Sequence, residues 1–288
     1  MDAVRETFVD LPAGPFRVLD WPGPEPAALF LHGLTGVAEV WGPTIAALGP
    51  DRPRCIAIDQ RGHGHSPKQA ASYGIGTFVA DALGVMSALK LDRSHLVGHS
   101  MGARVAMVLA ARHPAAIRSV AIVDIGPEEW KANWQETVAA FDRMPLTWPD
   151  AETAIGGAGR TRTPSSIDAA LASGGPDAET LRRIALARLK TLPDGSVTWL
   201  AAREALEKTV IAHRSRSYWH EWRTLAGPAL FVHGSASTEV RPRVAARMRA
   251  TNPSVVWEEF DGIGHNIPLL APSHLAKGLS RFWRRVSA

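Results

Sequence analysis

Short apolar segments recur along the chain, and longer segments with helical spacing separate several of them. Six of the apolar segments are rich in Val, Ile, Leu and Ala and have the length of buried strands. They are residues 28–31, 54–59, 95–99, 119–124, 229–233 and 254–260. Helical spacing covers residues 77–89 and 102–113. Because parallel strands need crossover connections, this order predicts the α/β class, with a mostly parallel sheet and helices on both faces.

Two further regions depart from this alternation. Residues 6–11 and 16–21 flank Pro12-Ala13-Gly14, which predicts a hairpin leading into the sheet. After Asp124, about a hundred residues pass before the next apolar segment, which is too long for a loop. This stretch is therefore predicted to be an insertion into the α/β core.

The insertion has the features of a small helical domain. Helical spacing occurs in residues 178–190 and 201–210. We predict a mostly helical cap of residues 127–226, between two core parts of residues 1–126 and 227–288. Its tryptophans could line a substrate pocket or form the cap's own core, because a thin domain needs large side chains to bury area. They are Trp130, Trp134, Trp148, Trp199, Trp219 and Trp222.

The strongest chemical signal is the run Gly98-His99-Ser100-Met101-Gly102. It follows a predicted strand and opens a predicted helix, which is the context that a G-x-S-x-G nucleophile turn requires. Small residues on both sides allow a strained turn that exposes the hydroxyl, and the amides of the helix N-terminus point toward developing negative charge. We predict that Ser100 is a nucleophile.

A serine hydroxyl needs a base within hydrogen-bond reach. His265 lies in a glycine-rich turn, Gly262-Ile263-Gly264-His265, after the last predicted strand and before the final helix. A loop at this place can bring an imidazole to Ser100, so His265 is the predicted base. Structural roles are predicted for five histidines that lie beside glycines at strand ends and turns, namely His32, His63, His65, His99 and His233.

Negative charge on a carbonyl oxygen during acyl transfer needs hydrogen-bond donors that are already in place. The run from Leu31 to Gly36 follows a predicted strand, and the backbone N–H of Leu34 is its predicted donor. Met101, directly after the nucleophile, supplies the second predicted N–H. The chain has only one cysteine, and no metal site is predicted.

These motifs together resemble the α/β-hydrolase fold family over nearly the whole chain. The resemblance rests on four motifs in the family's order: His32-Gly33, Asp59 to Ser66, Gly98 to Gly102, and Gly262 to His265. It implies an eight-stranded, mostly parallel sheet, a lid inserted after the sixth strand, and no cofactor. Haloalkane dehalogenases and epoxide hydrolases of this fold have an aspartate where this chain has Ser100, which argues against those reactions.

The chain departs from the family at the acid that orients the histidine. Most relatives place this acid after the seventh strand, where the present sequence has Ser237. Asp124, at the end of the sixth predicted strand, is an alternative that some members of the family use. We predict Asp124 as the acid, with Glu239 or no acid as the alternatives.

Composition limits the other functional classes. Hydrophobic residues make up 45% and charged residues 21%, as in ordinary globular proteins. The net charge is +4, but the arginines are scattered among carboxylates, so neither nucleic-acid nor membrane binding is predicted. The charged N-terminal segment predicts a cytoplasmic location. The single cysteine, Cys55, lies in an apolar run and is predicted to be a buried strand thiol. The sequence gives no signal for an oligomeric state.

The predicted function is that of a serine hydrolase, of the carboxylesterase type, acting on a small molecule. Ser100 would attack an apolar carboxylic ester and form an acyl-enzyme, with Asp124 and His265 completing a catalytic triad. A C–C bond hydrolase, lactonase, amidase or perhydrolase uses nearly the same residues. A ligand receptor that keeps the triad is a further alternative, because a fold does not dictate its function.

Overall fold

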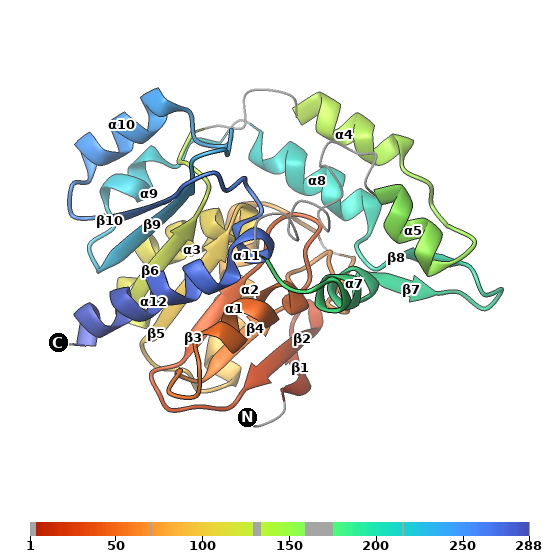
Figure 1. Cartoon of the computed structure of the whole chain (residues 1–288), viewed down its shortest axis with the longest axis horizontal. Coiled ribbons are helices and arrows are strands. Elements are labelled where there is room, and N and C mark those ends of the chain that lie inside the picture. Colours follow the sequence, from red (N-terminus) through yellow and green to blue (C-terminus); the bar gives the residue numbers. More distant parts are fainter. Residues whose placement is uncertain (1–3, 70, 129–133, 159–174, 215, 288) are drawn as a thin grey trace.

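The structure, a computed structural model, describes residues 4–69, 71–128, 134–158, 175–214 and 216–287, and a central sheet dominates it (Figure 1). Eight strands follow the order β1-β2-β4-β3-β5-β6-β9-β10. The pairs β1–β2 and β2–β4 are antiparallel, and the other neighbours are parallel. The bounds are β1 Arg5–Leu11, β2 Gly14–Trp21, β3 Ala28–Leu31, β4 Cys55–Ile58, β5 Ser94–His99, β6 Ile117–Val123, β9 Ala229–Gly234 and β10 Val256–Phe260. The predicted fold class is confirmed.

The sequence pattern located these strands closely. Each predicted apolar segment contains or overlaps one strand, and the predicted N-terminal hairpin forms between β1 and β2. Leu11 pairs with Gly14 across a two-residue turn, and Gly14 has a φ of 115°. A residue with a Cβ rarely adopts such a φ, so glycine suits this turn.

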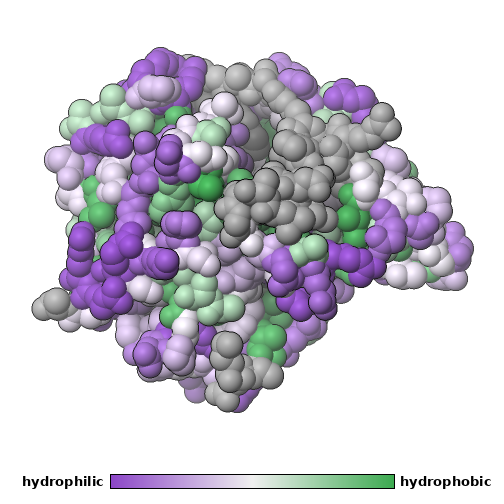
Figure 2. All heavy atoms as spheres, viewed as in Figure 1, coloured by the Kyte–Doolittle hydropathy of each residue, from purple (hydrophilic) through white to green (hydrophobic). Residues whose placement is uncertain are grey.

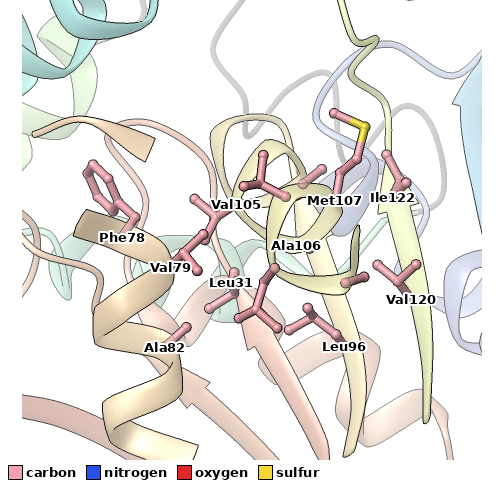
Figure 3. Packing of buried hydrophobic residues seen from close by; sticks show 14 of the residues in the cluster. Leu31, Phe78, Val79, Ala82, Leu96, Val105, Ala106, Met107, Val120 and Ile122 are labelled. Carbon is pink, nitrogen blue, oxygen red and sulfur yellow. The ribbon is translucent and has the colours of Figure 1, made fainter. Parts of the chain in front are cut away.

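Two hydrophobic cores lie on opposite faces of the sheet. Leu29 and Leu31 of β3 belong to one core, whereas Ala28 and Phe30 belong to the other, because successive side chains of a strand point to opposite faces. Helices α2 (Ile75–Ala88), α3 (Met101–Arg112) and α10 (Pro242–Thr251) pack on the first core, part of which Figure 3 shows. Helices α1 (Gly42–Ala47), α11 (Ile267–Leu270) and α12 (Pro272–Ser287) pack on the second.

The insertion between β6 and helix α9 (Trp219–Arg223) holds four helices and a small hairpin in its described part. Figure 1 shows most of them beside the sheet, at the upper right. They are α4 Trp134–Arg143, α5 Ala151–Ala158, α7 Ala178–Leu186, β7 Leu189–Thr191, β8 Val197–Trp199 and α8 Arg203–His213. The hairpin differs from the helix predicted to continue through residue 190. The chain instead reverses at Asp194-Gly195, where Gly195 has a φ of 85°, and Leu189 pairs with Trp199.

The tryptophans of the insertion divide between cap and core. The ring centroids of Trp148 and Trp199 lie 6.2 Å apart within the cap, and Trp134 packs against the cluster that contains Phe141 of α4. Trp219 and Trp222 belong to α9 (Trp219–Arg223), which packs on α3 and joins the first core of the sheet. Trp130 lies outside the described residues. Most of these side chains therefore bury area inside a hydrophobic cluster.

Cap and core meet at the loops that follow β3 and β4. The Ala202 amide, at the start of α8, donates to the Gly62 carbonyl oxygen at 3.1 Å. Leu34 packs against the cap cluster around Phe141 and Leu206 as well as against the first core. Outside these contacts, Figure 2 shows hydrophilic residues over much of one face, with hydrophobic residues in separate patches. None of the described helices is long and apolar enough to span a bilayer.

Candidate active site

Ser100 lies in a sharp turn between β5 and α3. Its backbone has φ 53° and ψ −117°, a strained conformation for a residue with a side chain. A Cβ at Gly98 would lie 2.3 Å from the Gly102 carbonyl oxygen, and one at Gly102 would lie 2.2 Å from that of Leu31. Both glycines are needed because strand and helix pack this closely, and the packing fixes the position of the Ser100 hydroxyl.

His265 and Asp124 continue from Ser100 in a line of hydrogen bonds. The Nε2 atom of His265 lies 3.0 Å from the Ser100 Oγ, and its Nδ1 lies 2.7 Å from the Asp124 Oδ2. With the proton on Nδ1, the ring donates to the carboxylate and accepts from the serine hydroxyl. Asp124 follows β6 with a φ of 54°, and His265 lies in the loop between β10 and α11. The structure thus brings the predicted nucleophile, base and acid together.

The Asp124 carboxylate is completely buried and has three further donors. Its Oδ1 accepts from the His233 Nδ1 at 2.9 Å and from the Gly234 amide at 3.1 Å, and its Oδ2 accepts from the Ser237 hydroxyl at 2.5 Å. Burial alone would raise the pKa of Asp124, but the hydrogen bonds from His233, His265 and Ser237 hold that pKa below its ordinary value. Asp124 is therefore an anion at neutral pH.

Glu239, the alternative acid, lies elsewhere. It is exposed, and no hydrogen bond or ion pair joins its carboxylate to His265 in the described part of the chain. Its backbone N–H donates to the Ser237 hydroxyl at 3.3 Å, so that hydroxyl links the loop after β9 to Asp124. The serine at the usual acid position thus supports an acid on the neighbouring strand.

The acid–base properties of His265 follow from these neighbours. Burial lowers the pKa of His265, but the hydrogen bond to Asp124 and the charges of Glu239 and Asp124 outweigh this effect, so the pKa lies above its ordinary value. His99 holds the same loop, because its Nε2 lies 2.8 Å from the His265 carbonyl oxygen. Burial, together with the charge of His265, lowers the pKa of His99 to about 3, so His99 is a neutral donor.

The loop after β3 faces the nucleophile. A Cβ at Gly33 would lie 3.2 Å from the Ser100 Cβ and 3.1 Å from the His99 Nδ1, so the backbone at Gly33 passes directly beside the turn that carries Ser100. Among the described residues, neither the Leu34 nor the Met101 N–H has a hydrogen-bond partner. Both N–H groups therefore remain candidates for the predicted oxyanion hole.

Two buried histidines shape this loop. The Nε2 of His32 accepts from the Gln60 amide at 3.0 Å, and the Nε2 of His63 accepts from the Thr35 amide at 3.1 Å. Their rings lie 5.0 Å apart. Burial lowers the pKa of His32, and burial together with the charge of His32 lowers that of His63 to about 3, so both are neutral acceptors.

The remaining candidate residues have simpler surroundings. Cys55 is buried in β4, and burial raises the pKa of its thiol to about 12, which makes it a poor nucleophile. The structure groups no three His, Cys, Asp or Glu side chains of the described ranges in a way that could hold a metal ion.

Sequence reasoning did not assign His233 to Asp124. It predicted a structural role from the glycine that follows His233 at the strand end. The signal lies in the strand order, because parallel pairing of Val123 with Val232 places the next residues, Asp124 and His233, at one edge of the sheet. That pairing becomes visible only once β6 and β9 are known to be neighbours.

A protein-family model described as alpha/beta hydrolase fold matches residues 26–272. The chain belongs to the alpha/beta hydrolase fold family. This alpha/beta hydrolase is 30% identical over 264 residues to 2-(acetamidomethylene)succinate hydrolase of Mesorhizobium japonicum, covering 90% of the present chain and 88% of that protein. It is 25% identical over 269 residues to sn-1-specific diacylglycerol lipase ABHD11 of Mus musculus, covering 93% and 84% of the two chains.

Solved structures agree with this membership. A crystal structure of E-2-(acetamidomethylene)succinate hydrolase superposes on the alpha/beta hydrolase with a TM-score of 0.86 at 26% identity, covering 98% of this chain and 100% of that one. A thioesterase domain from the curacin biosynthetic pathway shares the fold at a TM-score of 0.78. The resemblance drawn from the sequence motifs is confirmed, and the relatives support a hydrolase.

Proposed function

We propose that the protein is a serine hydrolase that cleaves an apolar carboxylic ester through an acyl-enzyme. The observation that carries this proposal is the continuous line of hydrogen bonds from Ser100 through His265 to Asp124, at 3.0 and 2.7 Å. A base within reach of a partly buried serine hydroxyl on a strained turn, and an anion that holds the base in one tautomer, are the parts that activate a serine.

In the proposed reaction, the Nε2 of His265 takes the Ser100 proton as Oγ attacks the ester carbonyl. The imidazolium that forms is stabilised by Asp124, which stays ionised. The Leu34 and Met101 amides bind the oxyanion. His265 then protonates the leaving alcohol, and in the second half it removes a proton from water, which attacks the acyl-serine and releases the carboxylic acid.

A cavity in the cap supports an apolar substrate. Its volume is about 150 Å³, and Phe141, Ala201 and Leu206 are among its lining residues. These three residues belong, with Val210, to the cap cluster against which Leu34 packs. The cavity is thus lined by residues of a cluster that contacts the loop carrying a proposed oxyanion donor, although neither Leu34 nor Ser100 lines it. Cavities of this size accept a ring the size of benzene.

A second candidate substrate is an amide or ester that carries a carboxylate. The Mesorhizobium japonicum relative is named for a succinate, which is a dicarboxylate. In this chain Arg104 is buried on α3, four residues beyond Ser100, and its positive charge acts to lower the pKa of His265. The guanidinium donates to the Glu128 carbonyl oxygen and lies over the Tyr218 ring, and a buried cation whose charge acts on His265 would favour a negatively charged substituent on the substrate.

The test is turnover on a matched panel of substrates. p-Nitrophenyl esters of increasing chain length, a carboxylate-bearing ester, lactones and anilides would be assayed with the wild type and with Arg104→Met. We expect burst kinetics followed by many cycles on neutral esters. If the wild type prefers the carboxylate-bearing ester and Arg104→Met removes that preference, the second candidate is favoured. Binding of the esters without turnover would contradict the proposed function and indicate a receptor.

A further inference from the structure

The Asp124 carboxylate accepts as many hydrogen bonds as its lone pairs allow. Two reach Oδ1, from His233 and from the Gly234 amide, and two reach Oδ2, from His265 and Ser237. An ionised carboxylate offers about four lone-pair positions in its plane. All four are therefore occupied, and rotation of the carboxylate would break several hydrogen bonds at once.

His233 is the only side chain among the described residues that donates to Oδ1. It stands at the end of β9, its side chain is only 11% exposed, and its ring stacks on Phe231 at 6.3 Å. Because an ionised carboxylate can only accept, the Nδ1 of His233 carries the proton of this hydrogen bond. Two histidines, one at the end of β9 and one in the loop after β10, thus bind different oxygens of one carboxylate.

We propose that His233 is a positioning residue: its Nδ1–H fixes the plane of the Asp124 carboxylate, so that Oδ2 presents a lone pair to the Nδ1–H of His265. This inference rests on the proposed serine hydrolase function. His233 touches neither substrate nor nucleophile in the proposed reaction and acts through Asp124. Ser237 completes the arrangement at the oxygen shared with His265.

Two consequences distinguish this role from simple packing. Without the donor at Oδ1, the carboxylate can turn about its Cβ–Cγ bond, so the orientation of His265 is lost in part of the population and kcat falls. In addition, the hydrogen bond from His265 to Asp124, which raises the pKa of His265, is then made in only part of the population. The pKa of His265 therefore falls, because burial, which lowers it, is less well offset.

The experiment compares His233→Leu, which removes the donor, with His233→Asn, which keeps one. The amide nitrogen of Asn, like Nδ1 of His, is bonded to Cγ. We expect His233→Leu to lower kcat by roughly 10- to 100-fold with little change in KM. This is the range found when a residue that orients a metal ligand is replaced. The midpoint of the kcat/KM profile of His233→Leu against pH should fall by roughly 0.5 to 1 unit. His233→Asn should recover most of both values.

A matched control is His95→Leu. His95 is also buried, and its Nδ1 lies 2.7 Å from the Ser119 Oγ, but it stands near the opposite end of its strand and contacts Trp283. Its replacement is expected to cost stability without moving the pH midpoint. Equal losses for His233→Leu and His233→Asn, or an unmoved midpoint in His233→Leu, would overturn the proposed role.

A measurement without substrate separates this inference from the proposed function. The Nδ1 proton of His265, held at 2.7 Å from Asp124, should give a downfield proton resonance in the wild type and in His233→Asn. In His233→Leu we expect this resonance to broaden or disappear. Persistence of the resonance in His233→Leu would refute the positioning role. If the wild type shows the resonance but neither turns over esters nor reacts with a fluorophosphonate, the proposed function fails and the positioning of Asp124 stands.

Discussion

The edge of the sheet and the cap hold their residues in different ways. At the sheet edge, Ser100, Asp124 and His233 each follow or end a strand, and Gly98 and Gly102 allow contacts too close for any side chain. The cap has small clusters of its own and an exposed Leu146, 68% exposed, beside its cavity. The difference indicates that the proposed reaction depends on close backbone packing at the strand ends. The choice of substrate depends instead on side chains of the cap.

The largest expected effect removes the nucleophile from the sheet edge. Ser100→Ala should lower kcat by roughly 10⁵- to 10⁶-fold, because the proposed acyl-enzyme cannot form. Steady-state kinetics on a p-nitrophenyl ester would measure the loss, and circular dichroism would check that the fold persists. Mass spectrometry should find a fluorophosphonate adduct on Ser100 of the wild type; an adduct on another residue would disprove the assignment.

The acid gives the next largest effect. Asp124→Asn should cost roughly 10³- to 10⁴-fold in kcat, because the amide favours the wrong tautomer of His265. Glu239→Gln, at an exposed position on the neighbouring loop, should cost less than about tenfold. The same kinetic assay compares the two variants, and the opposite ranking would assign the acid to Glu239.

A change in the cap should alter selectivity rather than chemistry. Met144 lines the cavity and is only partly buried, so Met144→Trp should fill part of the space. We expect about a tenfold fall in kcat/KM for an aromatic or long-chain ester and little change for an acetyl ester. Ile211→Trp, at an exposed position outside the lining, is the control. A uniform loss on every ester would mean that the cavity does not take the acyl group.

The pH dependence should show how the sheet edge affects the base. His265 must be neutral to accept the Ser100 proton, and its pKa is raised. Activity should therefore increase with pH, with a midpoint above the value of about 6.5 for an ordinary histidine. A kcat/KM profile on a neutral ester would measure the midpoint. A midpoint below that of a free imidazole would show that desolvation outweighs the Asp124 hydrogen bond.

The smallest expected effect is that of a chelator. The proposed mechanism uses only side chains and backbone amides, so EDTA should leave the ester hydrolysis rate unchanged. The rate before and after prolonged dialysis against EDTA is the measurement. Loss of activity that zinc restores would require a metal in the reaction.

Much of the fold could be predicted because its signals are local. Apolar runs located the strands, and the glycines around Ser100 and His265 identified the turns that carry them. The choice of Asp124 over Glu239 depended on knowledge of the family and on the end of a strand. The structure places the Asp124 Oδ2 2.7 Å from the His265 Nδ1, and the role of Asp124 as the acid stays a prediction.

Long-range features were not accessible in the same way. The bond from His233 to Asp124 depends on the pairing of β6 with β9, which no local pattern encodes. The helix predicted through residue 190 ends at Leu186, because tertiary pairing of β7 with β8 overrides helical spacing. Likewise, α9 lies in the predicted cap range but packs on α3, since burial of Trp222 against Phe231 requires the folded sheet.

The order of the site residues along the chain has a consequence for how activity arises. Ser100 and Asp124 precede the cap, whereas His233, Ser237 and His265 follow it. A growing polypeptide that has emerged only as far as β6 carries an aspartate whose four donors have not yet been made. The complete site can therefore form only after the part of the chain that follows the cap has been synthesised. A chain cut at the exposed Asp194-Gly195 turn would divide the nucleophile and acid from the base, so that hydrolysis would report the reassembly of the two fragments.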